Sequence, residues 1–157
     1  MIDAYVMLKW AHILGAAVLF GTGAGIAWFQ WTAWRAGDMA AFAAVARLVV
    51  KADWTFTLTA GLIQPLTGAA LILHAGWDPL ADWLVLAYGL YAFVFCCWAP
   101  VVGLQLRARD LAAAAVVSGA PAPAALGRIM RIWFLLGWPG FLAMLALVWV
   151  MIAKPEF

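Results

Sequence analysis

Residues Trp10–Trp34 read WAHILGAAVLFGTGAGIAWFQWTAW and lie between two basic residues, Lys9 and Arg35. The stretch contains no Asp, Glu, Lys or Arg, and it exceeds the roughly 20 apolar residues that a helix needs to cross a bilayer. Its one ionisable side chain is His12, to which hydrocarbon offers no polar partner. The stretch therefore predicts a membrane-spanning helix and marks His12 as the first candidate for a functional residue.

The rest of the chain repeats this pattern. The 157 residues are 69% hydrophobic and only 10% charged, whereas soluble globular domains have about 25% charged residues. Lipid requires backbone groups to be hydrogen-bonded within their own segment, which favours helices. We therefore predict one all-α membrane domain over residues 1–157, an integral four-helix bundle. Its expected spans are residues 8–34, 54–76, 83–106 and 132–153.

Basic residues are concentrated in the two connections that we expect to be cytoplasmic, residues 35–53 and 107–131. They are Arg35, Arg47 and Lys51 in the first, and Arg107, Arg109, Arg128 and Arg131 in the second. The opposite side has fewer cations, Lys9 and Lys154, together with Asp78 and Asp82. Because short cytoplasmic loops retain Lys and Arg, both termini are predicted on the outer, periplasmic side of a bacterial inner membrane.

The two connections also contain signals for helix ends. Gly37 and Asp38 predict a turn followed by the N-cap of a helix over residues 39–53. The sequence leaves open whether this helix extends the second span or lies on the membrane surface. The run from Ser118 to Pro123 predicts a flexible segment in the other connection.

A proline interrupts the second span. Pro65 has no backbone N–H and should bend the helix at its middle. Nearby Gln64 and Thr67 could bond to the freed carbonyl, or could line a cavity.

A second histidine, His74, is predicted on the same side of the membrane as His12. The first span reaches His12 soon after entering, and the second reaches His74 in its last turn, so their depths should differ by roughly one turn. Lys9 is three residues before His12 and shares its helix face. Imidazole is a common axial ligand of haem iron, and an interfacial lysine can pair with propionates. This set predicts haem b near the outer leaflet, with His12 as axial ligand, His74 as candidate second ligand and Lys9 as propionate partner.

Other roles for these residues are open. His12 could be a neutral histidine hydrogen-bonded across the bundle, and His74 could have a purely interfacial role. Copper is an alternative metal, with Met7 or Met151 as soft ligands at a similar level. Tyr88, in the third span, could join His12 in a polar cluster that binds the cofactor or handles protons or a quinone. No catalytic residue can be named from the sequence.

The start of the chain resembles a known superfamily. The segment Leu8–Gly15, LKWAHILG, followed by Gly21, resembles the first helix of the CopD-like superfamily. That group includes the CopD copper-resistance membrane proteins and the HemJ-type protoporphyrinogen oxidases. The shared pattern is a basic residue three positions before a histidine, then an apolar run and a glycine. The resemblance implies a four-helix core and a haem b whose ligand would be His12.

A closer resemblance covers most of the chain. The segments Lys51–Thr57 with Gln64–Gly68, and Arg128–Phe134 with Gly137–Pro139, resemble a family of predicted bacterial integral membrane proteins of unknown function. That family implies no activity of its own.

The function predicted from the sequence is that of a small multi-pass membrane protein that binds haem b and has a redox-linked or electron-transfer role. One alternative is a non-catalytic accessory subunit that packs against a larger membrane complex. Another is a HemJ-like oxidoreductase acting on a porphyrin or quinone. The expected partners are the lipid bilayer and other membrane subunits or a second copy of the chain, and no nucleic acid is expected.

Overall fold

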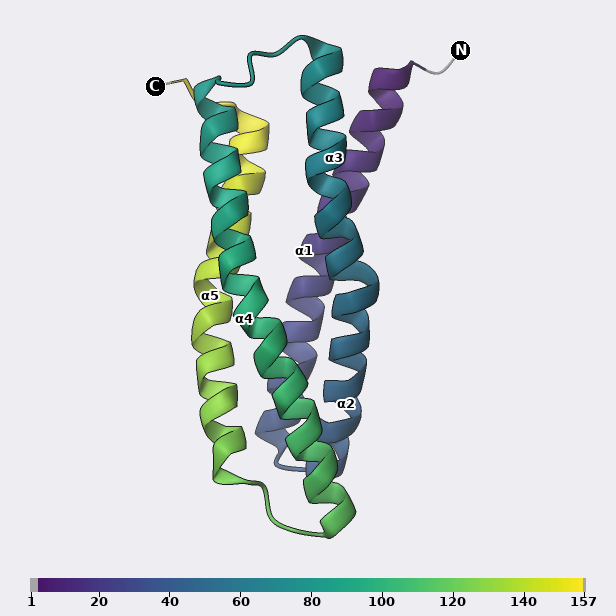
Figure 1. The fold of residues 1–157 in the computed structure, drawn as a ribbon, viewed down its shortest axis with the longest axis vertical. Helices are drawn as coiled ribbons and strands as arrows, with labels where there is room; N and C mark the ends of the chain where they lie inside the picture. The colour runs from purple at the N-terminus through teal and green to yellow at the C-terminus, as the bar shows by residue number, and fades with distance from the viewer. Residues whose placement is uncertain (1–2, 157) are drawn as a thin grey trace.

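The computed structural model describes residues 3–156, and all regular secondary structure in that range is helical. Four helical segments are long and apolar enough to cross a membrane, and they are joined by short connections (Figure 1). They are α1 (Ala4–Ala36), Met39–Ala75, α4 (Asp82–Ser118) and α5 (Ala124–Ala153). The start of α1 and the end of α5 lie at the same end of the bundle (Figure 1). The predicted all-α architecture with four spanning helices is therefore confirmed.

The segment Met39–Ala75 is a single helix in three parts. It comprises α2 (Met39–Ala52), the π-helical turn η1 (Asp53–Thr57) and α3 (Leu58–Ala75). Hydrogen bonding continues through the π turn, because the Leu58 N–H donates to the Asp53 carbonyl. The helix that the sequence predicted over residues 39–53 therefore extends the second span. Single π turns of this kind are frequent at functional sites.

The helix ends follow the local sequence signals. The Asp38 carboxylate accepts hydrogen bonds from the N–H groups of Ala40 and Ala41, at 2.9 and 3.1 Å, as an N-cap does. Gly37 before it has a φ of 76°, and Gly119 after α4 has a φ of 64°, a conformation that glycine adopts without strain. The predicted turn at Gly37 is confirmed, and the predicted flexible segment Ser118–Pro123 contains the end of α4 and the non-helical residues before α5.

The helices continue beyond the spans expected from the charges. α1 begins at Ala4, α4 runs on to Ser118 and α5 already begins at Ala124. Most of residues 35–53 and 107–131, expected as cytoplasmic connections, is therefore helical. The physical reason is that these stretches are rich in alanine, the strongest helix former, so charged residues limit the membrane span without ending the helix.

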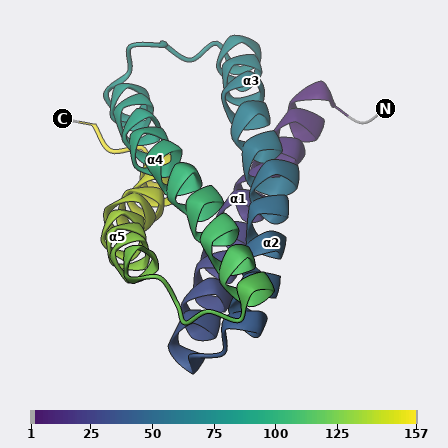
Figure 2. The same ribbon diagram turned by 60° about the horizontal axis from the view of Figure 1, so that its bottom comes forward.

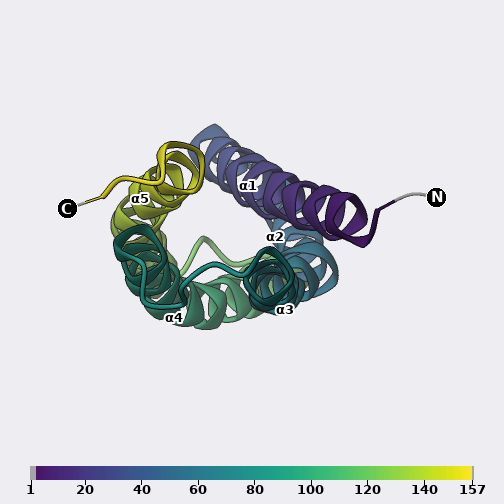
Figure 3. The same cartoon turned by 90° about the horizontal axis from the view of Figure 1, so that it is seen from above.

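The bundle consists of two helix pairs that are joined mainly at one end. α4 packs along α5, α1 packs along α3, and α2 packs against both α4 and α1. Figures 2 and 3 show α1 and α3 on one side of the molecule and α4 with α5 on the other. We call the half with the chain ends and the 76–81 connection the terminal half, and the opposite half the core half. α3 and α4 diverge within the terminal half (Figure 1).

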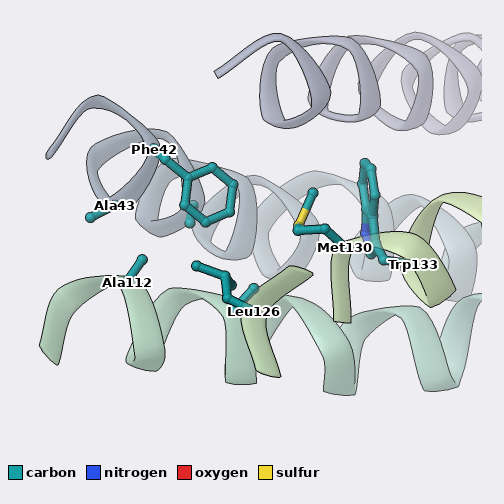
Figure 4. Packing of buried hydrophobic residues seen from close by; sticks show 8 residues of the cluster. Phe42, Ala43, Ala112, Leu126, Met130 and Trp133 are labelled. Atoms are coloured by element: carbon teal, nitrogen blue, oxygen red, sulfur yellow. The ribbon is translucent and has the colours of Figure 1, made fainter. Parts of the chain in front are cut away.

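The main hydrophobic core lies in the core half, where α2, α4 and α5 meet (Figure 4). Its side chains are almost inaccessible, and several are alanines, which allow helices to approach closely in a membrane. The members are Phe42, Ala43, Ala46, Ala108, Ala112, Leu126, Met130 and Trp133. A smaller cluster in the terminal half consists of Trp83, Leu84, Ala87 and Val150 and belongs to α4 and α5 only. Buried apolar side chains therefore hold α2, α4 and α5 together in the core half, and α4 and α5 in the terminal half.

Candidate functional site

His12 makes its side-chain contact with the neighbouring helix α3. Its Nδ1 lies 2.8 Å from Oγ1 of Thr67. The Thr67 hydroxyl has one hydrogen, which it donates to the carbonyl of Ile63 at 2.9 Å or of Gln64 at 3.1 Å. When that hydrogen is donated to a carbonyl, the Thr67 oxygen accepts from His12, and on this basis we assign the proton of the neutral ring to Nδ1. The second nitrogen, Nε2, then has a lone pair available for a ligand.

Close helix approach fixes this arrangement. The Gln64 side-chain amide donates a hydrogen bond of 2.8 Å to the backbone carbonyl of His12. A Cβ on Gly15 would lie 2.8 Å from Gln64 Nε2, so a larger residue at position 15 would displace that amide. A Cβ on Gly68 would lie 3.3 Å from Cε1 of the His12 ring. The two glycines thus allow α1 and α3 to meet around His12.

A tyrosine from α4 compensates for the proline in α3. Pro65 lacks an N–H, which leaves the Gly61 carbonyl without its partner within the helix. The Tyr91 hydroxyl donates to that carbonyl. The sequence suggested Gln64 and Thr67 for this role, but the structure uses them at His12 instead. Tyr91 was not singled out, because only the rotation of α4 decides which of its side chains face α3.

His74 belongs to a different group, at the end of the bundle. Its ring stacks on Tyr5, with ring centroids 6.1 Å apart, and its Nε2 lies 4.0 Å from the Asp3 carboxylate. Lys9 Nζ lies 5.9 Å from the centroid of the same Tyr5 ring. We call Asp3, Tyr5, Lys9 and His74 the terminal cluster. The structure thus brings Lys9 and His74 together around Tyr5, on the terminal side of His12.

The two histidines are about two turns apart in depth. His12 is level with Thr67, and His74 follows Thr67 by seven residues, which corresponds to about 10 Å at 1.5 Å per residue. From the sequence we expected a difference of roughly one turn. The register of α1 on α3 accounts for the change, because Gln64 and Gly68 pack directly against Gly15 and His12.

Tyr88 lies on α4 with 46% of its surface exposed. Its helix packs on α5 and α2 rather than on α1. No contact described by the structure joins Tyr88 to His12. Within residues 3–156 there is also no group of three or more His, Cys, Asp or Glu side chains arranged to hold a metal ion. Met7 and Met151, the soft ligands considered for copper, are at least one-third exposed.

A set of buried polar residues in the core half was not among the candidates predicted from the sequence, where Asp53 entered only as the residue before the second span and within the segment Lys51–Thr57. Asp53 and Gln105 are each 2% exposed, and Gln30 is fully buried. Asp53 and Thr57 precede Gln64 by eleven and seven residues, which places the three on one helix face, and this periodicity could have revealed Asp53 and Thr57. Gln30 approaches the Met130 sulfur at 3.9 Å.

Two hollows lie on the bundle surface. One, of about 280 Å³, is formed by α1 and the η1–α3 segment, and Ala11 and Gly15 beside His12 line it. The other, of about 300 Å³, lies between α1 and α5 in the core half, with Trp31, Trp34 and Arg131 in its wall. The first adjoins the His12 backbone, and the second is remote from it.

Comparisons with known proteins identify the family and no activity. Residues 6–155 match the family described as predicted integral membrane protein (DUF2269). No curated protein and no solved structure matches the chain. The match agrees with the resemblance to an uncharacterised membrane family, and it does not extend to the CopD-like superfamily. The chain belongs to the DUF2269 family of predicted integral membrane proteins.

Proposed function

We propose that this membrane protein binds haem b through His12 and takes part in electron transfer. The observation that supports this is the hydrogen bond between His12 and Thr67. Histidines that ligate metals almost always donate their other ring N–H to a fixed acceptor, and Thr67 is such an acceptor for Nδ1. The Nε2 lone pair is the group that would ligate iron. Haem bound there would supply one-electron redox chemistry.

The surrounding residues fit an apolar ligand with an anionic edge. Gly68 gives the imidazole room, and Gln64 holds the backbone at His12 through its carbonyl. The terminal cluster lies further along α1, where Lys9 could pair with carboxylates at the membrane surface. In this proposal His74 supports that edge rather than the iron, because it lies two turns from the level of His12.

Visible spectra test the proposal. The full-length protein is purified in mild detergent from cells supplied with haem precursor, and spectra are recorded before and after dithionite reduction. A Soret band that shifts on reduction is expected in the wild type. The band should be lost in His12→Ala. Thr67→Val removes the acceptor at nearly constant volume and should weaken haem affinity by about 10–100-fold.

Cys96→Ala, an exposed position on α4, is the matched control and should keep the band. A wild-type protein that is fully helical but colourless would overturn the proposal. Retention of haem by a folded His12→Ala protein would remove the ligand assignment alone.

The orientation proposed with this function places both termini outside. The two ends share one end of the bundle (Figure 1), and most basic residues of the sequence belong to the helix segments at the other end. Since cytoplasmic loops retain Lys and Arg, the core half would be cytoplasmic and His12 would lie toward the outer leaflet of the inner membrane. A cysteine introduced at Ala120 should resist a membrane-impermeant thiol reagent in intact cells, whereas one at Leu80 should react.

An accessory-subunit role is the second candidate, and one observation favours it. A Cβ on Gly21, Gly23 or Gly25 of α1 would meet nothing within 4 Å. Glycines let membrane helices approach closely, and this chain does not use these three for its own packing. In native gels from gently solubilised membranes, Gly21→Leu with Gly25→Leu should then lose a larger complex while the subunit stays folded. A HemJ-like oxidoreductase acting on a porphyrin or quinone remains the third candidate.

A further inference from the structure

Asp53 is a buried carboxyl group without a basic partner. It is 2% exposed and lies in the π turn between α2 and α3. Within residues 3–156 the described ion pairs are His74 with Asp3 and Arg109 with Asp110, so none of them involves Asp53. The other basic side chains of the core half point to the surface: Arg35, Arg47, Lys51, Arg107, Arg128 and Arg131.

Polar groups nevertheless surround this carboxyl. Thr57, one turn along the same helix, and Trp98 and Gln105 from α4 present their side chains to it. Asp53 Oδ2, Thr57 Oγ1, Gln105 Oε1 and Trp98 Nε1 are buried, and although these side chains face the carboxyl, these four atoms do not reach the distance and angle of a full hydrogen bond. Buried polar groups are almost always satisfied, so an unsatisfied group calls for an explanation. Here several such atoms from two helices face one carboxyl.

A bare carboxylate at this position would be costly. An ionised group in an apolar interior loses several kcal/mol of hydration unless a charge or hydrogen bonds replace it, and ionisable residues within membrane helices are typically functional. No cationic side chain is available from η1, α1, α2 or α4, the elements around Asp53. A positive charge taken up from solution would neutralise the carboxylate where no side chain does so.

We propose that Asp53 is the centre of a cation-binding site in the core half, which takes up a monovalent cation, either a proton or Na⁺. Oxygen atoms of Asp53, Thr57 and Gln105 form a hard ligand set from two helices, as such cations prefer. The same neighbours also suit a proton. The Gln105 amide can accept from the protonated acid or, after rotation, donate to the carboxylate, and Trp98 can donate to either form.

This site is separate from His12. Thr67, the partner of His12, follows Asp53 by 14 residues, which places the two sites about 21 Å apart along the helix. The cation site does not depend on haem binding, so either proposal can fail without the other. The helix geometry also changes at this position, since the π turn η1 begins at Asp53.

Infrared difference spectroscopy tests this proposal on the full-length protein in phosphatidylcholine vesicles. Spectra are compared between mildly acidic and mildly basic pH, in choline chloride and in sodium chloride. The carbonyl stretch of a protonated carboxylic acid should change in the wild type and be absent in Asp53→Asn. The matched control is Asp110→Asn, an exposed carboxylate on α4, which should retain the wild-type band.

The two salts distinguish the two cations. A proton site gives a band that titrates with pH identically in both salts. A sodium site gives a band that Na⁺ removes at constant pH and choline does not. Gln105→Leu should shift the band to higher wavenumber, because the acid loses an acceptor, and this provides a second readout if Asp53→Asn misfolds. Wild-type spectra without such a band in any condition, or with a band that neither substitution alters, would overturn the proposal.

Discussion

The terminal half and the core half of this bundle differ in how their polar side chains are hydrogen-bonded. In the terminal half, polar side chains of α1 and α3 form explicit hydrogen bonds between His12, Thr67 and Gln64. In the core half, a tightly packed apolar cluster of α2, α4 and α5 is accompanied by buried polar atoms of Asp53, Thr57 and Gln105 that face one another without a full hydrogen bond. Hydrogen bonds between α1 and α3 thus fix helix register in the terminal half, whereas close apolar packing of three helices dominates the core half.

The largest effect is expected from removing a core side chain in the core half. Leu126 is completely buried among α2, α4 and α5, so Leu126→Ala should lower the free energy of unfolding by about 2–5 kcal/mol. Leu142, on the same helix but 56% exposed, is the matched control. Leu142→Ala should change stability by less than about 1 kcal/mol. Detergent-denaturation curves followed by circular dichroism measure both, and equal effects would show that the packing around Leu126 does not stabilise the core half.

The next largest loss of stability is expected where α1 and α3 meet at His12. Gly15→Val should displace Gln64 and break its bond to the His12 carbonyl, at a cost of about 1–3 kcal/mol. Gly21→Val places the same side chain on the same helix in open space, and it should cost much less. Unfolding midpoints of the two variants make the comparison. A harmless Gly15→Val would show that α1 and α3 approach less closely than described.

A smaller effect is expected where α4 reaches α3. Tyr91→Phe removes the hydroxyl that bonds to the Gly61 carbonyl, and interhelical hydrogen bonds in membranes contribute about 0.6 kcal/mol on average. Tyr88→Phe, one turn away and without such a bond, should be neutral. The same denaturation assay separates them. If Tyr88→Phe were the more damaging change, the rotation of α4 described here would be wrong.

The smallest effect is expected in the terminal cluster. Asp3→Asn removes the charge that faces His74 but keeps an oxygen for the N-cap bond to the Tyr5 N–H. Exposed ion pairs contribute about 0–1 kcal/mol, so stability should change little and any change should vanish at high salt. Asp3→Ala removes the cap as well and should cost about 0.5–2 kcal/mol. Equal costs for the two substitutions would show that the charge, rather than the cap, stabilises α1.

Some features of the site were accessible from the sequence. His12 was identified because an ionisable group in an uncharged span is costly, and the structure gives it a defined partner. The π turn was not accessible, because no residue pattern distinguishes it from the α-helix on either side. Asp53 was assigned to the boundary of a span, because charges were used to delimit spans, although α2 and α3 continue through it as one helix in which Asp53 is buried.

The sequence by itself determined that the chain suits a lipid environment and that four of its helical segments are long enough to span a membrane. The reason is that the length of an uncharged apolar run can be read along the chain, and this length decides whether a helix can cross the bilayer. It also determined the cap at Asp38 and the turns at Gly37 and Gly119, which depend on neighbouring residues only. Tertiary structure alone decided that His12 meets Thr67, that Tyr91 rather than Tyr88 reaches α3, and that Asp53 is buried. Each of these depends on helix rotation and register, which are set by where side chains from distant segments can pack together.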